Sequence, residues 1–553
     1  MTATEPPASP KLPPLDRRTF FKGGLLGSGL LAAPLSAQQP GRGFTHGVAS
    51  GEPGPDRVLL WTRFRADQDT ALEFEVSETM DFATTVASGT VTARAENDWC
   101  CKSFATGLQP ARFYYFRFIA PDGSISDSGR TRTLPQGPSD RFRMAVFSCA
   151  NIGFGWFNAY AHAAADGNFD CVLHLGDYFY EYAAGTYPST AETVAGRSVW
   201  PAHELVALAD YRERYAAYRR DPDLRRLHQL FPMIAIWDDH ESANDSWKGG
   251  AQNHQPETEG EWSVRKAAAM KAYREWMPVS DEPWADYEVG DLATLYRLDT
   301  RLTARDRQFD LGEILRERAT SEKARAALVA FRDGDYADPS RELLGADQQA
   351  WLAAGLKRSR AAGKTWQVLV QQVLMGTVIS PPSLAAALPK DAPDYIRQMV
   401  LAGAMAGSER LPFNMDAWDG YPAARRRVFE AALAADANLI SLAGDTHNAW
   451  AFDLDLAGAP VGVEFAGQSV ASPGFEGYLP QIAPDALARD AVAANAQLKW
   501  MDPSRRGYMA VELTPGSASS EYRFLASVTE KGAGVVATKR VTTLAGSRTL
   551  DMG

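Results

Sequence analysis

Hydrophobic and polar residues alternate over short distances between residues 44 and 135. The runs contain β-branched and aromatic residues, and they cover residues 56–64, 71–78, 113–120 and 125–133. Short strands at such regular spacing predict a small all-β sandwich of the immunoglobulin or fibronectin kind. Pro135, Gly137 and Pro138 interrupt the pattern, and we interpret them as the boundary with the next region.

From residue 141 the pattern changes to apolar strand-like runs that alternate with helical periodicity. The predicted strands cover residues 142–148, 171–175, 233–237, 366–371 and 439–443. Apolar residues recur every three or four positions in residues 156–165, 205–220, 346–358 and 423–435. The alternation predicts a layered α/β domain over residues 141–530, followed by a tail at 531–553. The polar stretch 240–345 gives no clear elements.

The first 37 residues have the pattern of an export signal. Arg17 and Arg18 precede an apolar, glycine-rich stretch from Gly23 to Leu35, and small residues end near Ala37. This order is typical of a twin-arginine signal peptide. We therefore expect a periplasmic or secreted protein that uses the twin-arginine translocation machinery. No other apolar stretch approaches the length of a membrane span, so no permanent membrane anchor is expected.

The composition narrows the possible partners. The formal net charge of −11 argues against nucleic acid as the main partner. Anionic substrates remain compatible with it, because bound cations can reverse the sign of a local field. The four cysteines are too few for a disulfide framework. Cys100 and Cys101 are either buried free thiols or bonded elsewhere.

Potential metal ligands follow four of the five predicted α/β strands. They are Cys149, Asp177, the run from Asp238 to His240, and Asp445 with His447. Ligand sites in open α/β sheets gather beyond the carboxyl ends of the strands, so one crevice can collect all four groups. We expect a metal site there.

The motif Gly176-Asp-Tyr-Phe-Tyr180 follows a predicted strand directly. Gly176 allows a sharp turn, and the carboxylate of Asp177 can bridge two metals. The phenolate of Tyr180 is a hard ligand that favours ferric iron. Taken alone, Tyr180 is better explained as a buried core aromatic.

The motif Trp237-Asp-Asp-His-Glu241 ends another strand, and Asn244 follows it. So many polar groups beside a core strand are costly to bury unless cations or hydrogen bonds satisfy them. A solvated acidic loop is the alternative interpretation.

Gly444-Asp-Thr-His447 ends the last predicted strand. Its spacing can point Asp445 and His447 to one side of an extended backbone. Cys149 is a buried small side chain or, beside cations, an ionised thiolate ligand. A nucleophilic role for Cys149 ranks lower, because the sequence shows no separate Cys–His pairing.

Together these motifs resemble one family. Residues 147–151, 176–180, 237–241 and 444–447, with Thr45–Pro53 and Val58–Arg63 in the β-region, are similar to the motif series of PhoD-type alkaline phosphatases. The resemblance covers almost the whole chain. It implies the calcineurin-like metallophosphoesterase fold, a β-sandwich flanked by helices. Asp239 stands where the wider relatives carry Asn, so Asn244 is an alternative ligand.

The resemblance also implies the cofactors, Fe³⁺ and Ca²⁺. The residues assigned to iron are Cys149, Asp177, Tyr180, Asp445 and His447. Asp177 then bridges to calcium, which is bound through Asp239 or Asn244. Ligand chemistry agrees, since thiolate, phenolate and imidazole suit iron, whereas carboxylate and amide oxygens suit calcium.

The implied reaction is hydrolysis of phosphate monoesters and diesters by a metal-activated hydroxide. His240 and Asp239 are the residues expected to act in catalysis. His240 either protonates the leaving group or stabilises developing charge, or it contacts the metal ligands without binding the metal itself. Small phosphate esters are the expected substrates. Two alternatives stay open: a dedicated phosphodiesterase acting on teichoic acid or phospholipid head groups, and an exported binding protein with a decayed catalytic domain.

Overall fold

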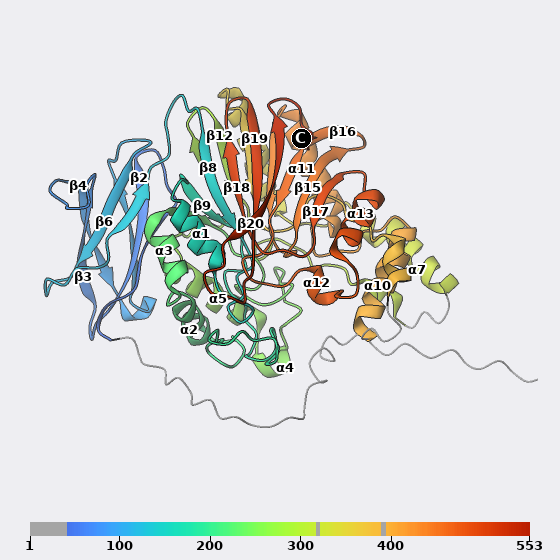
Figure 1. Cartoon of the computed structure of the whole chain (residues 1–553), viewed down its shortest axis with the longest axis horizontal. Helices are drawn as coiled ribbons and strands as arrows, with labels where there is room; N and C mark the ends of the chain where they lie inside the picture. The colour runs from blue at the N-terminus through green and yellow to red at the C-terminus, as the bar shows by residue number, and fades with distance from the viewer. Residues whose placement is uncertain (1–40, 317–320, 389–393, 553) are drawn as a thin grey trace, which may run out of the picture.

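The computed structural model describes residues 41–316, 321–388 and 394–552 (Figure 1). The expected leader, residues 1–37, lies outside the described residues. The largest sheet has ten strands in the order β21 (Leu550–Asp551), β20 (Val535–Leu544), β19 (Ser517–Leu525), β18 (Gly507–Leu513), β8 (Phe142–Phe147), β9 (Cys171–His174), β10 (Pro232–Ala235), β1 (Gly43–Gly51), β2 (Arg57–Arg65) and β5 (Cys100–Thr106). Its central strands β8, β9, β10 and β1 are parallel.

A second sheet of seven strands faces the first. Its order is β11 (Ala285–Val289), β12 (Ala293–Arg297), β13 (Trp366–Val370), β14 (Leu439–Ala443), β16 (Ala459–Ala466), β15 (Ala449–Leu456) and β17 (Leu498–Asp502). Strands β12, β13, β14 and β16 are parallel. Apolar side chains from both sheets form one buried layer between them.

Helices cover the outer faces of both sheets. One apolar cluster joins the ten-stranded sheet to α1 (Asn158–Asp166), α2 (Leu208–Tyr218), α3 (Pro222–Leu230) and α5 (Trp262–Trp276). Another joins the seven-stranded sheet to α8 (Gly345–Ala361), α11 (Pro422–Ala434) and α13 (Pro484–Ala494). In β8, Met144 and Val146 face the second sheet, whereas Ala145 and Phe147 face the helices. Strands buried on both faces explain the continuous apolar runs in the sequence.

The layered α/β fold predicted from the sequence is confirmed. Further helices complete it: α4 (Pro256–Glu259), α6 (Leu311–Leu315), α7 (Ser321–Asp333), α9 (Pro382–Ala387), α10 (Asp394–Ser408) and α12 (Phe475–Tyr478), with 3-10 turns at Ala95–Asn97, Asp335–Ala337 and Trp418–Gly420. The stretch 240–345, which the pattern left open, contains helices α4 to α7 and the hairpin of β11 and β12. Within the described ranges, no helix is both long enough and apolar enough to cross a bilayer.

The N-terminal region forms the expected β-sandwich. One of its two layers is a separate sheet, and the other is continuous with the ten-stranded sheet. Strands β4 (Thr85–Ala93), β3 (Thr70–Ser77), β6 (Phe113–Ile119) and β7 (Gly129–Arg132) make a separate sheet. The opposite layer is the end of the ten-stranded sheet, where β1 pairs with β10 at Ser50 and Pro232. Leu60 of β2 packs with Phe74 and Phe116 between the layers. The sandwich is therefore hydrogen-bonded to the α/β core.

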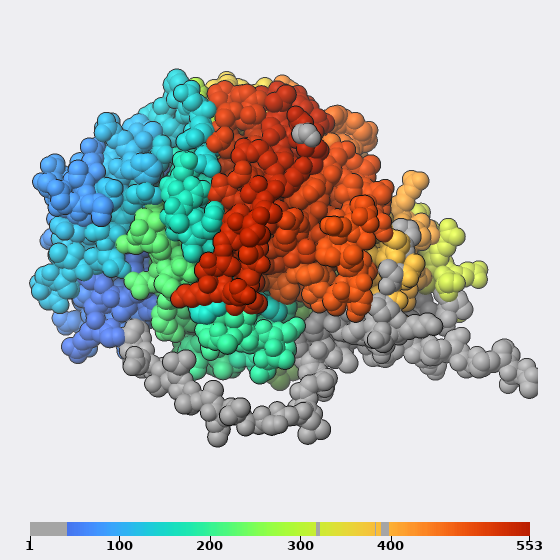
Figure 2. Space-filling model, in the orientation of Figure 1, coloured from blue at the N-terminus to red at the C-terminus, as the bar shows by residue number. Residues whose placement is uncertain are grey.

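The expected C-terminal tail at residues 531–553 is corrected by the structure. Strand β20 lies in this segment and pairs with β19 from Ser517↔Leu544 to Leu525↔Val535. Val541 is buried in the layer between the two sheets. In Figure 2 the C-terminal segment, in red, covers the middle of the visible face between the cyan and orange segments. Strand β20 lies near a sheet edge with one face in solvent, so its sequence alternates between small and polar residues. It therefore lacks the continuous apolar run from which the other strands were predicted.

Two valines on opposite faces of β20 test this strand. Val541 is 1% exposed and Val536 is 65% exposed. We expect Val541→Ala to lower the free energy of unfolding by about 2 kcal/mol, because two buried methyl groups are lost. The matched control Val536→Ala should change it by less than about 0.5 kcal/mol. Urea unfolding followed by tryptophan fluorescence measures both, and equal small effects would contradict the packed strand.

Candidate metal centre

The loops after β8, β9, β10 and β14 bring the predicted ligands together. One group consists of Cys149, Asp177 and His447, whose donor atoms all lie within 4.8 Å of one another. Tyr180 completes this group, since its hydroxyl donates to Asp177 Oδ2 at 3.1 Å and lies 3.0 Å from His447 Nε2. Residues separated by almost 300 positions in the sequence therefore share one site.

Two further groups continue from the first. Asp177, Asp239 and His240 form the second group, and Asp238, Asp239 and Asp445 form the third, each with donor atoms within 4.8 Å of one another. Asp177 belongs to the first two groups and Asp239 to the last two. The three groups are thus one continuous array of potential donors, linked by the shared carboxylates of Asp177 and Asp239.

Several carboxylate oxygens in the array are buried without a partner. Asp177 Oδ1, Asp238 Oδ2 and Asp239 Oδ1 have no hydrogen-bond donor among the described residues. Burying an unsatisfied charged oxygen is costly, so such atoms call for a compensating group. The donor set fits cations, because hard oxygen atoms from carboxylates stand beside a thiol, a phenol and an imidazole.

Burial also changes the proton affinities of these side chains. Burial, followed by the charges of neighbouring carboxylates, raises the pKa of Asp177 and of Asp445 well above the usual value. Burial and the charge of Asp177 likewise raise the pKa of the Cys149 thiol. For His447, burial lowers the pKa to about 3. A neutral imidazole is the form that ligates metals, and ionised carboxylates and thiolate here require positive charge nearby.

The ligand loops have a strained backbone. Cys149, Asp177, Asp445 and His447 all have positive φ angles, of 60°, 52°, 60° and 64°. Residues other than glycine rarely adopt this left-handed backbone conformation. They keep it only where the surrounding structure holds the backbone there. Four residues of this kind at one site indicate that the fold forces these donors toward a common centre.

Two glycines allow the loops to approach one another closely. A Cβ atom at Gly176 would lie 2.3 Å from Cβ of Asp238, and one at Gly444 would lie 2.5 Å from the Ser148 hydroxyl. Any side chain at either position would push two ligand loops apart. The glycines that begin two of the motifs are therefore required by packing as well as by the turn.

Glu241 fastens two of the loops to each other, a role that the sequence did not reveal. Its carboxylate accepts hydrogen bonds from the backbone N–H groups of Asp177 at 3.1 Å, Tyr178 at 2.6 Å and Asp238 at 2.7 Å. Its place in the Trp237–Glu241 motif was visible in the sequence. The role was not, because two of the three hydrogen bonds come from a loop more than sixty residues earlier.

Glu181 orients His240, and no sequence motif indicated this pair. Glu181 is fully buried, and its Oε2 lies 2.7 Å from His240 Nδ1. The Tyr180 ring packs on the imidazole with centroids 4.2 Å apart. Burial opposes protonation of His240, but the charges of Asp239, Asp177 and Glu181 outweigh it and raise the pKa. The imidazole is therefore held in one orientation, and the surrounding carboxylates favour its protonated form.

Arg301 was also missed, and it carries the main positive charge at the site. Its fully buried guanidinium binds Asp238, contacts Asp416 at 2.7 and 2.9 Å and lies 3.0 Å from Asp445. Asp239 is 3.8 Å away. Arg301 follows β12, in the stretch where the hydrophobic pattern predicted no elements. Only the packing of the two sheets brings it to the carboxylates.

Asn244, the alternative ligand, lies at the margin of the array. Its side-chain amide donates to Gln252 at 2.9 Å, and its backbone N–H donates to Glu181 at 2.8 Å. Asp239 Oδ2 accepts from the backbone N–H of Asp245 at 2.6 Å. Both side chains thus have one fixed contact, and their assignment as calcium ligands stays a prediction.

Comparisons with known proteins show the family of the chain. A model of the PhoD-like phosphatases matches residues 144–522, and one of their N-terminal domain matches residues 30–135. Alkaline phosphatase D of Bacillus subtilis (strain 168) is 31% identical over 567 residues, covering 94% of this chain and 86% of that protein. A solved structure of PhoD is 29% identical, with a TM-score of 0.74 and 92% of each chain covered.

The fold and these matches define the chain as a phosphoric ester hydrolase. More particularly, it belongs to the PhoD-like phosphatase family. The family resemblance and the enzyme class expected from the sequence are thereby confirmed, which argues against the non-catalytic binding protein.

Removing Arg301 tests its structural role. In metal-free protein, Arg301→Met leaves buried carboxylates without their partner, and we expect the free energy of unfolding to fall by about 3–5 kcal/mol. Arg112, paired with Glu78 on the surface, is the matched control. Arg112→Met should cost less than about 1 kcal/mol. Equal losses in urea unfolding would show that the Arg301 contacts contribute no more than a surface pair.

Proposed function

We propose that the chain is an exported phosphatase that hydrolyses phosphate monoesters and diesters at a centre of iron and calcium. One observation carries the proposal: the donor atoms of Cys149, Asp177 and His447 meet within 4.8 Å, and Asp177 also belongs to the neighbouring group with Asp239. The 31% identity to an alkaline phosphatase supports the reaction.

The donor types support the two metals. Iron would be held by Cys149, Asp177, Tyr180, Asp445 and His447, because thiolate, phenolate and imidazole together suit iron. Calcium would be held by Asp177 and Asp239 with Asn244, because it prefers several oxygen ligands. The buried unpartnered oxygens of Asp177 and Asp239 are the atoms that such ions would satisfy.

Bound cations of this kind polarise phosphoryl oxygens and lower the pKa of water, which supplies a nucleophile at neutral pH. The side chains of the protein would hold the cations and fix the positions of the loops around them. Asp177 joins two donor groups, and Glu241 holds its loop against that of Asp238 through three backbone hydrogen bonds. The buried array excludes bulk water, which strengthens every charge interaction inside it.

His240 is placed to supply a proton. Hydrolysis forms a new P–O bond from water and breaks the bond to the alcohol, whose oxygen must then gain a proton. His240 Nδ1 is engaged by Glu181 at 2.7 Å, which leaves Nε2 for transfer. A positioned imidazole of this kind contributes about 10²–10⁴-fold to the rate. Asp239, in the same donor group, helps to keep this imidazole charged.

Two buried cysteines provide a matched test of the metal site. Cys149 lies in the donor array, whereas Cys171 lies in the apolar layer between the sheets. We expect Cys149→Ala and Asp177→Asn to lose bound iron and to lower turnover by more than about 100-fold. Even mutation of a residue that only hydrogen-bonds to a metal ligand lowers metal affinity or activity by about 10–100-fold. Cys171→Ala should keep both iron and turnover.

Elemental analysis, the visible absorption of the protein and rates on p-nitrophenyl phosphate and bis-p-nitrophenyl phosphate give the readouts. A ferric phenolate from Tyr180 should colour the wild-type protein, and the colour should disappear in Cys149→Ala. Full activity in colourless protein without iron or calcium would defeat the metal assignment. Hydrolysis of the diester alone would instead identify a dedicated phosphodiesterase.

The export route has its own test. Replacing Arg17 and Arg18 by Lys should block transport, because the arginine pair is the feature that the translocation machinery reads. The full-length precursor should then accumulate in the cytoplasm of the expression host, as followed by fractionation and immunoblotting. Replacement of Lys11, an upstream basic residue, by Arg is the matched control. Unchanged export of the double variant would contradict the twin-arginine assignment.

A further inference from the structure

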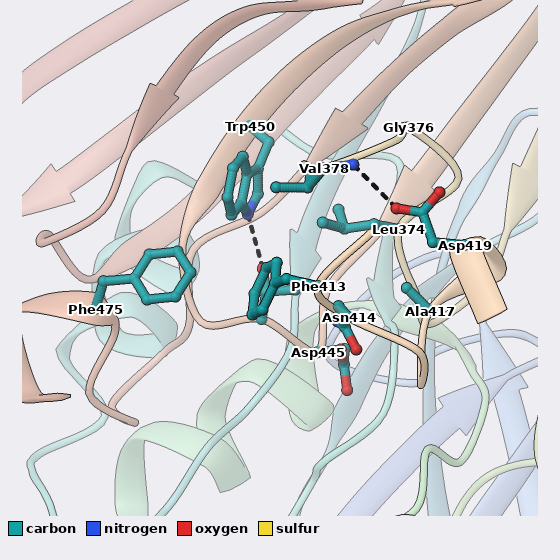
Figure 3. Close-up of a pocket in the computed structure, with 11 residues that line it drawn as sticks. Leu374, Gly376, Val378, Phe413, Asn414, Ala417, Asp419, Asp445, Trp450 and Phe475 are labelled. Carbon is teal, nitrogen blue, oxygen red and sulfur yellow. Dashed lines mark hydrogen bonds between the residues drawn. The ribbon is translucent and has the colours of Figure 1, made fainter. Parts of the chain in front are cut away.

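An apolar cavity lies directly beside the donor array. It has a volume of about 200 Å³. Most of its wall consists of six apolar side chains: Leu374, Val378, Phe413, Ala417, Trp450 and Phe475 (Figure 3). The rings of Phe413 and Phe475 are 6.3 Å apart, and those of Trp450 and Phe475 are 6.0 Å apart. Phe413 and Phe475 are only half-buried, so they form the rim.

Most polar groups of the cavity wall already have partners inside the protein. Asp419 accepts from Arg425 at 2.6 Å and from the backbone N–H of Val378 at 2.9 Å. Thr446 Oγ1 accepts from the Trp450 indole at 2.8 Å. A hydroxyl group that entered the apolar part of the cavity would therefore lose its water without gaining an equivalent partner. The wall favours an apolar occupant.

Asp445 connects this cavity to the donor array. It lines the cavity, and its carboxylate also belongs to the group with Asp238 and Asp239. Asn414 lies at the same edge of the cavity (Figure 3), and its side chain accepts from the backbone N–H of Asp416, which in turn binds Arg301. A phosphate ester whose phosphorus lies at the array can therefore place its organic part in the cavity.

The volume limits the size of that organic part. An apolar protein cavity of about 150 Å³ is large enough to hold one benzene molecule. The present cavity, at about 200 Å³, has room for one ring or a short branched alkyl group. A longer chain would have to leave through the rim formed by Phe413 and Phe475.

We propose that the cavity between Trp450, Phe475 and Val378 is a specificity subsite for the alcohol part of the substrate. It selects phosphate esters of small apolar alcohols, such as an aryl or arylmethyl group, over esters of polyols. The proposal rests on the phosphatase function proposed above and adds the substrate class to it. Trp450, Phe475 and Val378 act by binding the substrate and take no part in proton transfer.

A pair of monoesters tests the subsite. Benzyl phosphate and glycerol 1-phosphate both release a primary alcohol, so their intrinsic reactivities are similar, but only the first carries an apolar ring. With the mature protein loaded with iron and calcium, we expect kcat/KM for benzyl phosphate to exceed that for glycerol 1-phosphate by about tenfold or more. The difference should lie mainly in KM if the ring binds equally in the ground and transition states.

Two variants alter the cavity in different ways. Val378→Phe fills it, and Phe475→Asn makes its half-exposed rim polar on the short helix α12. Each should lower kcat/KM for benzyl phosphate about tenfold more than it lowers the value for glycerol 1-phosphate. Phe113→Asn, at a ring 41% exposed on the N-terminal sheet, is the matched control and should change neither value.

The outcomes separate the subsite from the proposed function. Hydrolysis of neither ester by metal-loaded wild-type protein would overturn the phosphatase proposal itself. Equal hydrolysis of both esters by wild type, with both variants unchanged, would overturn the subsite alone. A variant that lowers both rates equally would also count against the subsite, because the effect would then be structural. Selective loss of benzyl phosphate hydrolysis in either variant supports it.

Discussion

Buried carboxylates at the ends of parallel strands create a negative charge that the protein's own cationic side chains neutralise unevenly. Arg301 binds Asp238 and contacts Asp416 and Asp445. Elsewhere in the array, Asp177 Oδ1 is buried without a hydrogen-bond donor in the described structure. Because unpaired buried charge is so costly, this asymmetry favours cations beside Cys149, Tyr180 and His447.

The rest of the architecture holds this charge in place. The strands that carry the ligand loops are apolar on both faces, so their ends cannot shift without disturbing two packed layers. The left-handed backbone at Cys149, Asp177, Asp445 and His447 persists for the same reason. Glu241 adds a direct link between two of the loops. Ligand positions are thus set by the framework before any ion binds.

The charged array and the apolar cavity meet at Asp445. On one side of this residue the donors suit a phosphoryl group held by cations, and on the other side the wall suits a small apolar group. A phosphate ester has the same division between its charged and organic parts. Differences in the cavity wall can therefore change substrate preference without altering the donors, because the two parts of the site share few residues.

The sequence alone determined the strands that precede the motifs, the motifs themselves and the chemical types of the donors. Apolar runs ending at Cys149, Asp177, Asp238 and Asp445 predicted where ligands follow strands, because that signal is local. The roles of Glu181, Glu241 and Arg301 were decided by tertiary structure, as was the cavity beside Asp445. These depend on contacts between segments far apart in the chain, and a lone charged residue looks the same in sequence whether it faces solvent or a buried carboxylate. Strand β20 was missed for a related reason: a strand near the sheet edge buries one face only, so its apolar pattern is weak until its neighbour is known.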